Sequence, residues 1–513
     1  MLIADLVATS GVVAATRSRK AKVTAMAATL AAASSEELPL VTSWLGGALL
    51  QRRTGLGWRG LQTLPEPATT SSLTVAEVHA AFDHLAALTG SGSQQARAAA
   101  VVSLFGRATE DEQRWLRGLV TGEVRQGALD ALVQEALAAA AGVPLRAVRR
   151  AAMLAGSTVA VAVAAFEGEA ALAAVGLEVG RPVLPMLASS ATDVASAFAK
   201  VAPDGGQVAV DTKLDGIRIQ VHRSGEEVRV ATRSLDDITH RLPEVVALAR
   251  ALPASSFVLD GEAIALDDDG RPRPFQETAS RTAQDSGVAV TPYFFDVLHL
   301  DGHDLLDAPG EERLAALTRL VPESSLVARL VTDDPAEAEA FAADVVAAGH
   351  EGVVVKSLSA AYDAGRRGAG WVKVKPVHTL DLVVLAVEWG SGRRRGWLSN
   401  IHLGARDPDG EGDFVMLGKT FKGMSDELLR WQTQRFTELA TSPADGSEYV
   451  VHVRPEQVVE IAFDGLQRST RYPGGLALRF ARVLRYRDDK SAEEADTIDT
   501  VRSFLPGMQK TDG

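Results

Sequence analysis

The hydrophobic periodicity of this chain changes between residues 180 and 200, and that change limits the folds that are open to it. Up to about Gly180, alanine- and leucine-rich stretches carry apolar residues at the 3.6-residue spacing of helices. Two helix starts have the spacing of a capping box, Thr74 with Glu77 and Thr109 with Glu112. We therefore expect residues 1–200 to form an all-α domain.

Beyond residue 200 the apolar residues alternate, as they do in strands. From 201 to 377 such strands mix with helices, for example at 336–348, which predicts an α+β domain. Residues 378–513 hold one expected helix, at 425–439, and five short strands, which predicts a small closed β-barrel of the oligonucleotide-binding (OB) type. The strands are expected at 380–388, 398–403, 414–417, 448–453 and 457–463. A chain of 513 residues exceeds what one core usually holds, so a multidomain fold follows.

The chain has no cysteine. This excludes disulfides, thiolate catalysis and cysteine-ligated zinc, and it suits a reducing compartment. The longest apolar run, residues 151–166, is shorter than the roughly 20 residues that span a bilayer. We therefore expect a cytoplasmic protein without a membrane segment.

The net charge of −13 argues against a polyanionic partner, but the charge is unevenly distributed. Residues 1–60 hold seven Lys or Arg against three Asp or Glu, and residues 466–490 hold seven against two. Binding to nucleic acid depends on where the positive face lies. A locally basic clamp for nucleic acid on an acidic protein is therefore compatible with this composition.

One lysine stands where a nucleophile would fit. Lys213 ends an expected strand, and Asp215 and Gly216 turn the chain directly after it. Taken alone, it is an ordinary solvated lysine at a hairpin. Four later segments favour a different interpretation, because each brings charged or aromatic side chains to a strand.

The first two of these segments supply carboxylates and aromatic rings. Asp260 and Glu262 share one face of an expected strand, where buried carboxylates need a cation or a metal. Residues 293–298 offer rings on which a flat purine would stack.

The last two segments supply an acid and further cations. Glu351 precedes a strand that ends at Lys356. Lys373 and Lys375 share one strand face, where two cations repel unless an anion such as a triphosphate lies between them. Together the segments indicate a nucleophilic lysine, carboxylates for Mg²⁺, a stacking ring and lysines for phosphate.

These segments and their order resemble the covalent nucleotidyltransferase superfamily of ATP-dependent polynucleotide ligases and mRNA capping enzymes. Residues 213–218, Lys-Leu-Asp-Gly-Ile-Arg, match its Lys-x-Asp-Gly-x-Arg signature. Residues 478–490 resemble the final motif of the ligases, with its Arg-x-Asp-Lys ending. Residues 122–127 are similar to a segment of the helical DNA-binding domain of cellular DNA ligases. The resemblance covers all three expected domains.

The resemblance implies an ATP-dependent DNA ligase. In that family the lysine, here Lys213, attacks the α-phosphorus of ATP, pyrophosphate leaves and AMP remains on the lysine. AMP then passes to the 5′-phosphate at a nick, and the 3′-hydroxyl displaces it and seals the strand. The family also implies Mg²⁺, roles in DNA repair, replication and recombination, and a monomer on nicked double-stranded DNA.

Several nucleotide contacts follow from the resemblance alone. Arg218 and Glu262 match the ribose contacts, and Arg233 in the sequence Thr-Arg-Ser matches a phosphate or ribose contact. Phe295 looks like the ring that stacks on adenine. Many members of the family have glutamate two residues before the nucleophile, where it contacts the adenine amino group, and here that residue is Asp211.

The phosphate and metal contacts are assigned in the same way. Lys373 and Lys375 match the phosphate lysines, and Arg367 or its neighbour Arg366 matches another nucleotide-contacting arginine. Glu351 is similar to the metal-binding acid, and Glu262 is the second expected metal ligand.

The final basic motif implies a moving domain. In the ligases this part of the barrel swings over the nucleotide and helps to expel pyrophosphate, which here assigns that role to Arg487 and Lys490 and places a hinge at 376–381. The motif also fits a basic amphipathic tail.

Three other functions remain open on the sequence. An RNA ligase or a GTP-using capping enzyme shares the lysine signature but has no large helical domain ahead of it. An NAD-dependent ligase usually carries a four-cysteine zinc site, which this chain lacks. A non-catalytic DNA clamp would have no reason to keep the acids and lysines of the site.

Overall fold

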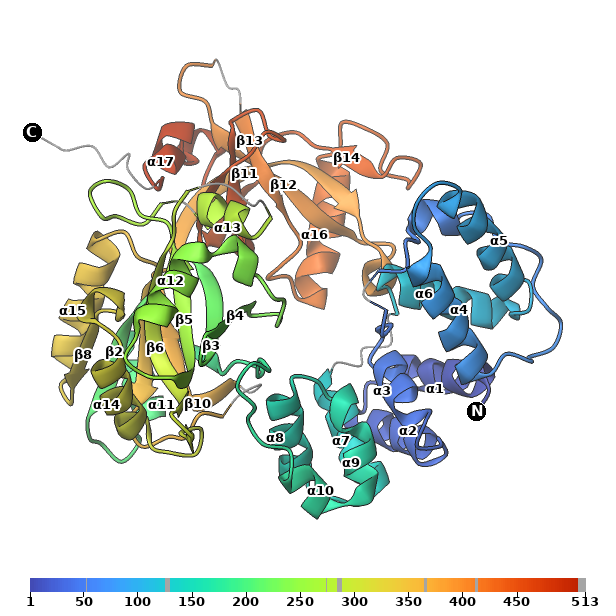
Figure 1. The fold of residues 1–513 in the computed structure, drawn as a ribbon. Helices are drawn as coiled ribbons and strands as arrows, with labels where there is room; N and C mark the ends of the chain where they lie inside the picture. The colour runs from blue at the N-terminus through green and yellow to red at the C-terminus, as the bar shows by residue number, and fades with distance from the viewer. Residues whose placement is uncertain are drawn as a thin grey trace, which may run out of the picture.

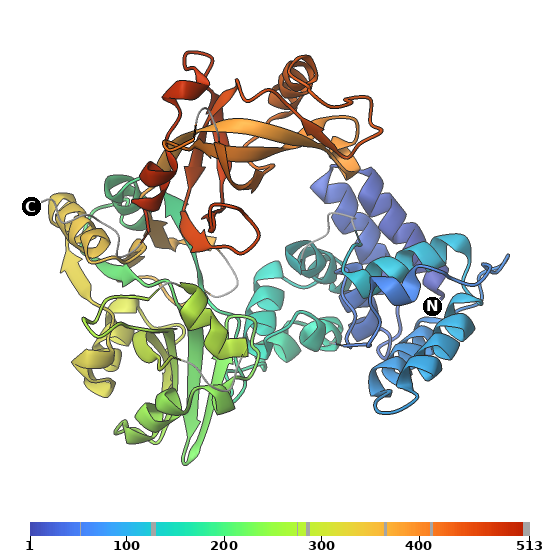
Figure 2. The same ribbon diagram turned by 90° about the horizontal axis from the view of Figure 1, so that it is seen from above.

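The computed structural model describes residues 1–51, 53–124, 130–273, 275–283, 288–363, 367–410 and 414–505. They form a helical region, a middle region with two five-stranded sheets, and a C-terminal region with a six-stranded sheet (Figure 1). Seen from above, the three regions lie around a common centre (Figure 2).

The described residues ahead of Leu187 fold into helices around one apolar core, whose largest buried side chains include Trp44, Phe82 and Phe105. The helices are α1 (Ile3–Ala15), α2 (Arg19–Ala31), α3 (Leu38–Leu45), η1 (Trp58–Leu61), α4 (Val75–Ala87), α5 (Ser93–Phe105), α6 (Glu110–Thr121), α7 (Asp130–Ala141), α8 (Leu145–Ala155), η2 (Val159–Val161), α9 (Ala162–Glu167) and α10 (Glu169–Ala173).

Both expected capping boxes are present, at the starts of α4 and α6. The Thr74 hydroxyl accepts from the Glu77 amide at 3.2 Å, and the Glu77 carboxylate accepts from the Thr74 amide at 3.0 Å. Thr109 and Glu112 make the same pair at 3.4 and 2.8 Å. Each box satisfies amides that the first turn of a helix leaves without an intrahelical partner. These two helix starts are confirmed.

The middle region contains two sheets, with strand orders β1-β10-β9-β2-β8 and β4-β3-β5-β6-β7. The strands are β1 (Leu187–Ala191), β2 (Val208–Lys213), β3 (Ile217–Ser224), β4 (Glu227–Thr232), β5 (Ser256–Ile264), β6 (Thr291–Leu300), β7 (His303–Asp304), β8 (Arg329–Thr332), β9 (Gly352–Ser357) and β10 (Arg367–Val374). The helices are α11 (Val194–Val201), η3 (Thr239–Arg241), α12 (Pro243–Ala251), α13 (Phe275–Ala283), α14 (Gly310–Leu320), η4 (Glu323–Ser325) and α15 (Pro335–Ala347). Strand β1 pairs in parallel with β10, so the first sheet begins ahead of residue 201.

The C-terminal region is built on a sheet with the order β13-β12-β11-β15-β18, in which β14 also pairs with β11. Its elements are β11 (His378–Trp389), η5 (Gly392–Arg394), β12 (Leu398–Arg406), β13 (Phe414–Thr420), α16 (Asp426–Glu438), β14 (Val450–His452), β15 (Val458–Phe463), β16 (Gly465–Arg468), β17 (Leu476–Arg479), β18 (Arg482–Tyr486), η6 (Ala492–Glu494) and α17 (Ile498–Arg502). The five expected strands and the expected helix are all present. Strands β16 to β18 lie within the basic stretch and were not expected.

The closed barrel expected from the sequence is not found among the strands that the structure describes, because β13 and β18 end the order of the sheet without a ladder between them. They meet through isolated hydrogen bonds instead. The Val483 amide donates to the Lys422 carbonyl at 3.0 Å, and the Thr420 hydroxyl donates to the Ala481 carbonyl at 2.6 Å. Lys422 lies just past the end of β13, so the strand has already stopped where β18 approaches.

Two different joints connect the middle region to its neighbours. On the helical side, Met153 and Leu154 of α8 belong to a buried apolar cluster with Val258, Leu298 and Trp371. On the C-terminal side, the contacts are ionic. Arg479 pairs with Asp215 at 2.8 Å, and Lys375 lies 3.7 Å from Asp464.

A buried histidine helps to hold the segment that enters the middle region. His222 on β3 accepts from the Gly180 amide at 3.0 Å and pairs with Gln220 at 2.9 Å. Gln220 in turn accepts from the Val183 amide at 2.8 Å. Burial lowers the pKa of His222 to about 3, so the ring stays neutral near neutral pH.

Replacing His222 by glutamine should reduce the acid sensitivity of the fold. The unfolded chain binds a proton at this histidine near pH 6.5 and the folded chain does not, so this residue makes stability fall as the pH drops from 6.5 towards 3. One proton corresponds to a slope of about 1.4 kcal/mol per pH unit. Urea midpoints measured at pH 7.5 and 5.0 should therefore differ less for His222→Gln than for the wild type. An equal difference for both proteins would contradict this assignment.

No single helix among the described residues is long and apolar enough to cross a membrane. One pair, α8 with residues 159–167, passes the length and composition test together but is bent by 117°.

Candidate functional site

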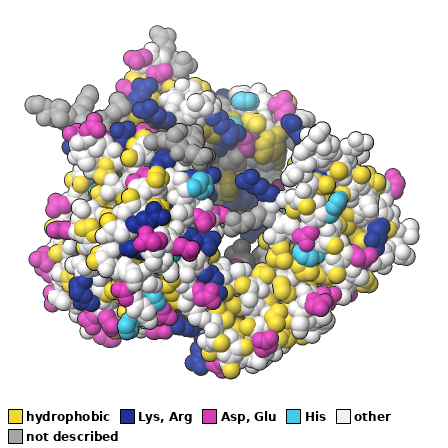
Figure 3. All heavy atoms as spheres, in the orientation of Figure 1, with side chains coloured by type: hydrophobic (Ala, Val, Ile, Leu, Met, Phe, Trp, Pro, Cys, Tyr) yellow, Lys and Arg dark blue, Asp and Glu magenta, His cyan; other side chains and the backbone are white. Residues whose placement is uncertain are grey.

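A cavity of about 840 Å³ lies between the two sheets of the middle region. Its walls come from β2, β9 and β10 of one sheet and from β3, β5 and β6 of the other. Residues from the C-terminal region, Arg479 and Phe480, also line it. The space-filling view shows a hollow between the regions with Lys and Arg side chains around it (Figure 3). Most of the residues expected at the site line this cavity, as the following contacts describe.

Lys213 ends β2 and lies beside two other charged groups. Its ammonium is ion-paired with one carboxylate oxygen of Glu351, and the ammonium of Lys375 is paired with the other oxygen. Burial pushes the pKa of Glu351 up, but the two ammonium groups outweigh it and hold that pKa below its usual value. Strand pairing produces this arrangement, because Lys213 lies opposite Gly352 on β9, next to Glu351. The pairing confirms that Glu351 immediately precedes a strand.

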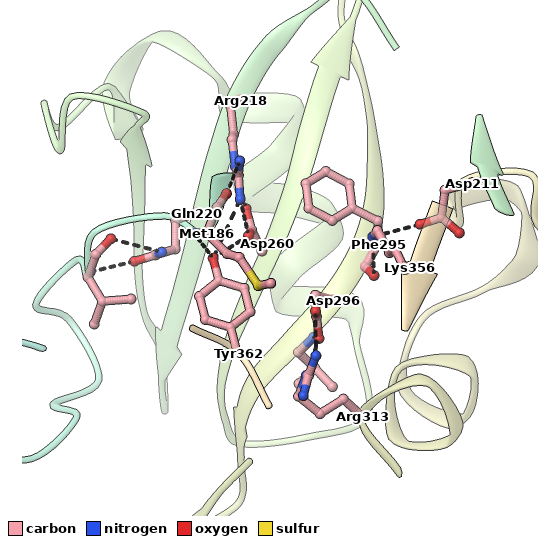
Figure 4. A network of polar contacts seen from close by, with 12 residues as sticks. Met186, Asp211, Arg218, Gln220, Asp260, Phe295, Asp296, Arg313, Lys356 and Tyr362 are labelled. Atoms are coloured by element: carbon pink, nitrogen blue, oxygen red, sulfur yellow. Dashed lines mark hydrogen bonds and ion pairs between the residues drawn. The ribbon is translucent and has the colours of Figure 1, made fainter. Parts of the chain in front are cut away.

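The two acids of β5 have different surroundings. Asp260 is buried and is chelated by Arg218, with Nε and Nη2 donating at 3.0 and 2.6 Å (Figure 4). The Tyr362 hydroxyl donates to the same carboxylate at 2.6 Å. Glu262 lines the cavity and accepts from the Gly216 amide at 3.3 Å. Burial raises the pKa of Glu262 to about 7, against the opposing charges of neighbouring cations.

Arg218 lines the cavity with most of its donors already engaged. In addition to its two bonds to Asp260, its Nη1 donates to the Met186 carbonyl at 2.8 Å. Its guanidinium lies 5.4 Å from the ring centre of Phe295 and 5.7 Å from that of Trp371. The arginine is therefore fixed in the wall, with its position set by Asp260.

Phe295 lines the cavity from β6, and Trp371 from β10 meets it edge to face with ring centres 5.8 Å apart. The ammonium of Lys356 lies 4.5 Å from the Phe295 ring centre and 4.1 Å from that of Trp371. Aromatic rings attract cations on their faces, and this attraction strengthens where water is excluded. Lys356 was noticed in the sequence as the base at the end of a strand, but no role was predicted for it.

Asp211 lies next to this aromatic cluster and is also paired with cations. Arg329 of β8 chelates its carboxylate, and the Lys356 ammonium lies 2.7 Å from Oδ2. Burial pushes the pKa of Asp211 up, but Arg329 and Lys356 outweigh it, so the carboxyl stays ionised. Arg329 belongs to no motif that the sequence reveals.

The remaining expected residues fall into two groups. In the first group, Arg233, Lys373 and Lys375 all line the cavity. Val372, which precedes Lys373 on the strand and faces the other way, is buried in an apolar cluster of the middle region. Arg366 and the side chain of Arg367 lie outside the described part of the chain, as do residues 125–127 of the segment 122–127 that resembles the helical DNA-binding domain.

Two residues of the final motif that had no individual role assigned, Arg479 and Phe480, reach the cavity. The Arg479 guanidinium donates to Asp215, two residues after Lys213, at 2.8 Å and lies 5.3 Å from the Phe275 ring centre. Phe480 has a φ of 55° and its side chain is 58% exposed. A left-handed backbone at a bulky exposed residue is strained, and such strain is typical of functional positions.

The two residues expected to act on pyrophosphate are bound elsewhere in this structure. Arg487 donates to both oxygens of Asp381, at 3.3 and 3.0 Å, and Lys490 donates to Oδ2 at 2.7 Å. Asp381 lies at the start of β11, in the expected hinge. In this arrangement the C-terminal region presents Arg479 and Phe480 to the cavity.

The described residues contain no group of three or more Asp, Glu, His or Cys side chains able to enclose a metal ion. Glu351 and Glu262 nevertheless line the cavity as oxygen donors. Mg²⁺ commonly binds through one or two carboxylates together with the phosphates of a substrate, so the donor set fits this ion when a nucleotide is present.

Three family models match successive parts of the chain. They are described as "DNA ligase N terminus" over residues 59–138, "ATP dependent DNA ligase domain" over residues 185–375 and "ATP dependent DNA ligase C terminal region" over residues 394–490. The second match contains the whole cavity apart from its C-terminal contribution.

Curated relatives match almost end to end. The chain is 73% identical over 510 residues to a "Probable DNA ligase" of Nocardioides sp. (strain ATCC BAA-499 / JS614), covering 98% of this chain and 99% of the relative. A "Probable DNA ligase" of Kineococcus radiotolerans is 68% identical over 505 residues, with the same coverage. Among solved structures, "Pmar-Lig_PreS3" has a TM-score of 0.62 at 18% identity and covers 94% of this chain and 99% of its own, which shows a similar fold.

Proposed function

Since the chain belongs to the family of ATP-dependent DNA ligases, we propose that Lys213 is the residue that carries AMP in its reaction. The protein is an enzyme that joins DNA at the expense of ATP, with the three-part architecture of that family and a sheet-rich C-terminal region. One observation carries the proposal that Lys213 is the nucleophile. The carboxylate of Glu351 lies between the ammonium groups of Lys213 and Lys375, and all three residues line the cavity.

The first step needs a neutral Lys213 amine as the nucleophile. It also needs positive groups that compensate the negative charge of the leaving pyrophosphate. The Lys213 amine attacks the α-phosphorus of ATP, a nitrogen–phosphorus bond forms, and the bond to the β-phosphate oxygen breaks, releasing pyrophosphate. The ammonium must first leave Glu351 and lose one proton to water, and the nitrogen releases a second proton to water as its bond to phosphorus forms. Lys373 and Lys375, on the same wall, compensate the charge on the phosphate oxygens as it redistributes.

The other expected residues would orient the nucleotide. Glu262 and Arg218 line the cavity where they would contact the ribose, and Phe295 offers a ring face to adenine. Arg233 would contact phosphate or ribose from the rim. Asp211 is an ionised acceptor close to that ring, so it would receive the adenine amino group.

Glu351 and Glu262 would hold Mg²⁺ together with ATP phosphates. When bound, the ion supplies positive charge that stabilises the phosphoryl oxygens during transfer. The contribution of Glu351 would then depend on its release from the two lysines.

Nicked double-stranded DNA is the proposed substrate, bound by a monomer at the centre around which the three regions lie. We propose a helical DNA-binding domain ahead of about residue 185, an adenylation domain to residue 377 and an OB-type domain beyond it. This first boundary lies nearer the N-terminus than the residue 200 expected from the sequence, because β1 pairs within the middle sheet. The contact of β13 with β18 near Lys422 supports an OB-type fold that is almost closed.

A labelling experiment tests this function. The protein is incubated with α-³²P-labelled ATP or GTP and Mg²⁺, separated on a denaturing gel, and then chased with nicked or intact duplex DNA. We expect label from ATP that disappears only with nicked DNA as sealed product accumulates. Label from GTP alone, or label that nicked DNA does not remove, would contradict the proposal.

A further inference from the structure

The carboxylate of Asp211 is held from two strands at once. The Arg329 guanidinium on β8 donates through Nε to Oδ1 and through Nη2 to Oδ2, the latter at 2.7 Å. Lys356 on β9 approaches Oδ2 at 2.7 Å. An ionised carboxylate offers about four acceptor positions, and three are used here. The fork of the guanidinium fixes the plane of the carboxylate, because both oxygens are engaged by one rigid group.

The same two cations also hold the aromatic wall. Arg329 Nη2 donates to the Phe295 carbonyl at 3.1 Å. The Lys356 ammonium donates to the same carbonyl at 3.4 Å (Figure 4). Lys356 additionally packs against the Phe295 ring. Arg329 therefore connects the acceptor, Asp211, to the backbone of the residue whose ring would stack on a base.

Arg329 itself does not line the cavity, whereas Asp211, Lys356 and Phe295 do. Its effect on a bound nucleotide must therefore pass through those residues. A base with an exocyclic amino group at position 6 can donate to the remaining acceptor position of Asp211. A base with a carbonyl oxygen there places one acceptor against another.

We propose that Arg329 is a positioning residue for the choice of base, holding Asp211 so that the cavity selects a 6-amino purine. This rests on the proposed binding of ATP in the cavity. Arg329 makes no contact with the nucleotide and takes no part in the chemistry. Without its fork, Asp211 can turn, and the acceptor is no longer fixed relative to the Phe295 ring.

The test compares ATP with purine riboside 5′-triphosphate, which lacks only the 6-amino group. Formation of the lysyl nucleotide is followed by intact-protein mass spectrometry, and kcat/KM is measured for each nucleotide. A hydrogen bond to a charged group contributes about 1.5–3 kcal/mol, so the wild type should prefer ATP by roughly 10- to 150-fold. Arg329→Met should lower this preference to about threefold or less, mainly through a slower reaction with ATP.

A general structural effect would slow both nucleotides equally and leave the preference unchanged, and that result would overturn the proposal. Arg281→Met is the matched control, because Arg281 is a largely buried arginine of the same region that pairs with Glu244 at 3.1 Å and does not line the cavity. The control should keep the wild-type preference. A comparable loss of preference in the control would also count against the role of Arg329.

A second variant keeps the test decisive if Arg329→Met fails to fold. Asp211→Asn retains the shape of the side chain but turns one acceptor oxygen into a donor. It should lose the same preference for ATP, and an unchanged preference would overturn the proposal. Failure of the wild type to form any lysyl nucleotide would instead contradict the proposed function, so the two failures are distinguishable.

Discussion

Lys213→Ala should abolish formation of the lysyl nucleotide, with a loss on the order of 10⁴-fold or more. The expected loss is this large because no covalent intermediate can form without the amine. The variant is measured with α-³²P-labelled ATP on a denaturing gel beside the wild type. Lys213→Arg serves as a matched variant, because it keeps a cation beside Glu351 but a guanidinium is never neutral in proteins. It should be as inactive as the alanine variant.

Sealing of a nick that already carries AMP on its 5′-phosphate should survive in both variants, since that step needs no lysine nucleophile. This activity shows that the variants are folded and still bind DNA. Label that persists in Lys213→Ala would assign the nucleophile to another amine of the cavity. Lys356 would be the first residue to examine, because burial lowers its pKa.

Arg313→Met should destabilise the middle region by about 3–5 kcal/mol. Arg313 is 2% exposed and donates to Asp296 at 2.8 and 3.3 Å and to the Ala308 carbonyl at 2.6 Å. Its removal leaves the buried carboxylate of Asp296 without its cation, which is the main cost. The loss is measured as the shift in the midpoint of urea unfolding.

Two comparisons separate this cause from others. The double variant Asp296→Leu with Arg313→Met removes both charges and should recover most of the stability. Arg150→Met breaks a bidentate pair with Asp307 whose side chains are 48% and 72% exposed, and it should change stability by less than about 1 kcal/mol. Equal losses for Arg313→Met and Arg150→Met would contradict the argument from burial.

Local patterns in the sequence predicted much of the secondary structure. The strands β2 and β10 were expected because apolar residues alternate in them, and β9 because a short apolar run has the character of a buried strand. The helix starts at Thr74 and Thr109 were expected because capping spacing is local. The closed barrel was not found among the strands that the structure describes. Whether β13 pairs with β18 depends on where each strand ends relative to the other, and local periodicity does not report that distance.

The candidate site was partly predictable for the same reason. Lys213, Glu262 and Lys375 stand in short motifs, whereas Arg329 lies 118 residues from its partner Asp211 and stands in none. The pairing of β2 with both β8 and β9 brings these groups together. The pairing of strands that lie far apart in the sequence depends on packing of the whole region. The sequence therefore did not predict that Arg329 and Lys356 surround Asp211, and the structure was needed to show it.

The two joints of the middle region should respond differently to salt. The joint with α8 combines an apolar cluster, which dissolved ions screen very little, with one exposed ion pair, Arg150 with Asp307. The joint with the C-terminal region is made by Arg479 with Asp215 and Lys375 with Asp464, which are partly exposed charges that salt screens. We therefore expect added salt to weaken the C-terminal joint more than the joint with α8, because the apolar cluster of the latter remains. This difference is what the proposed hinge at 376–381 would need, with the C-terminal region as the part that moves and the helical and middle regions held together.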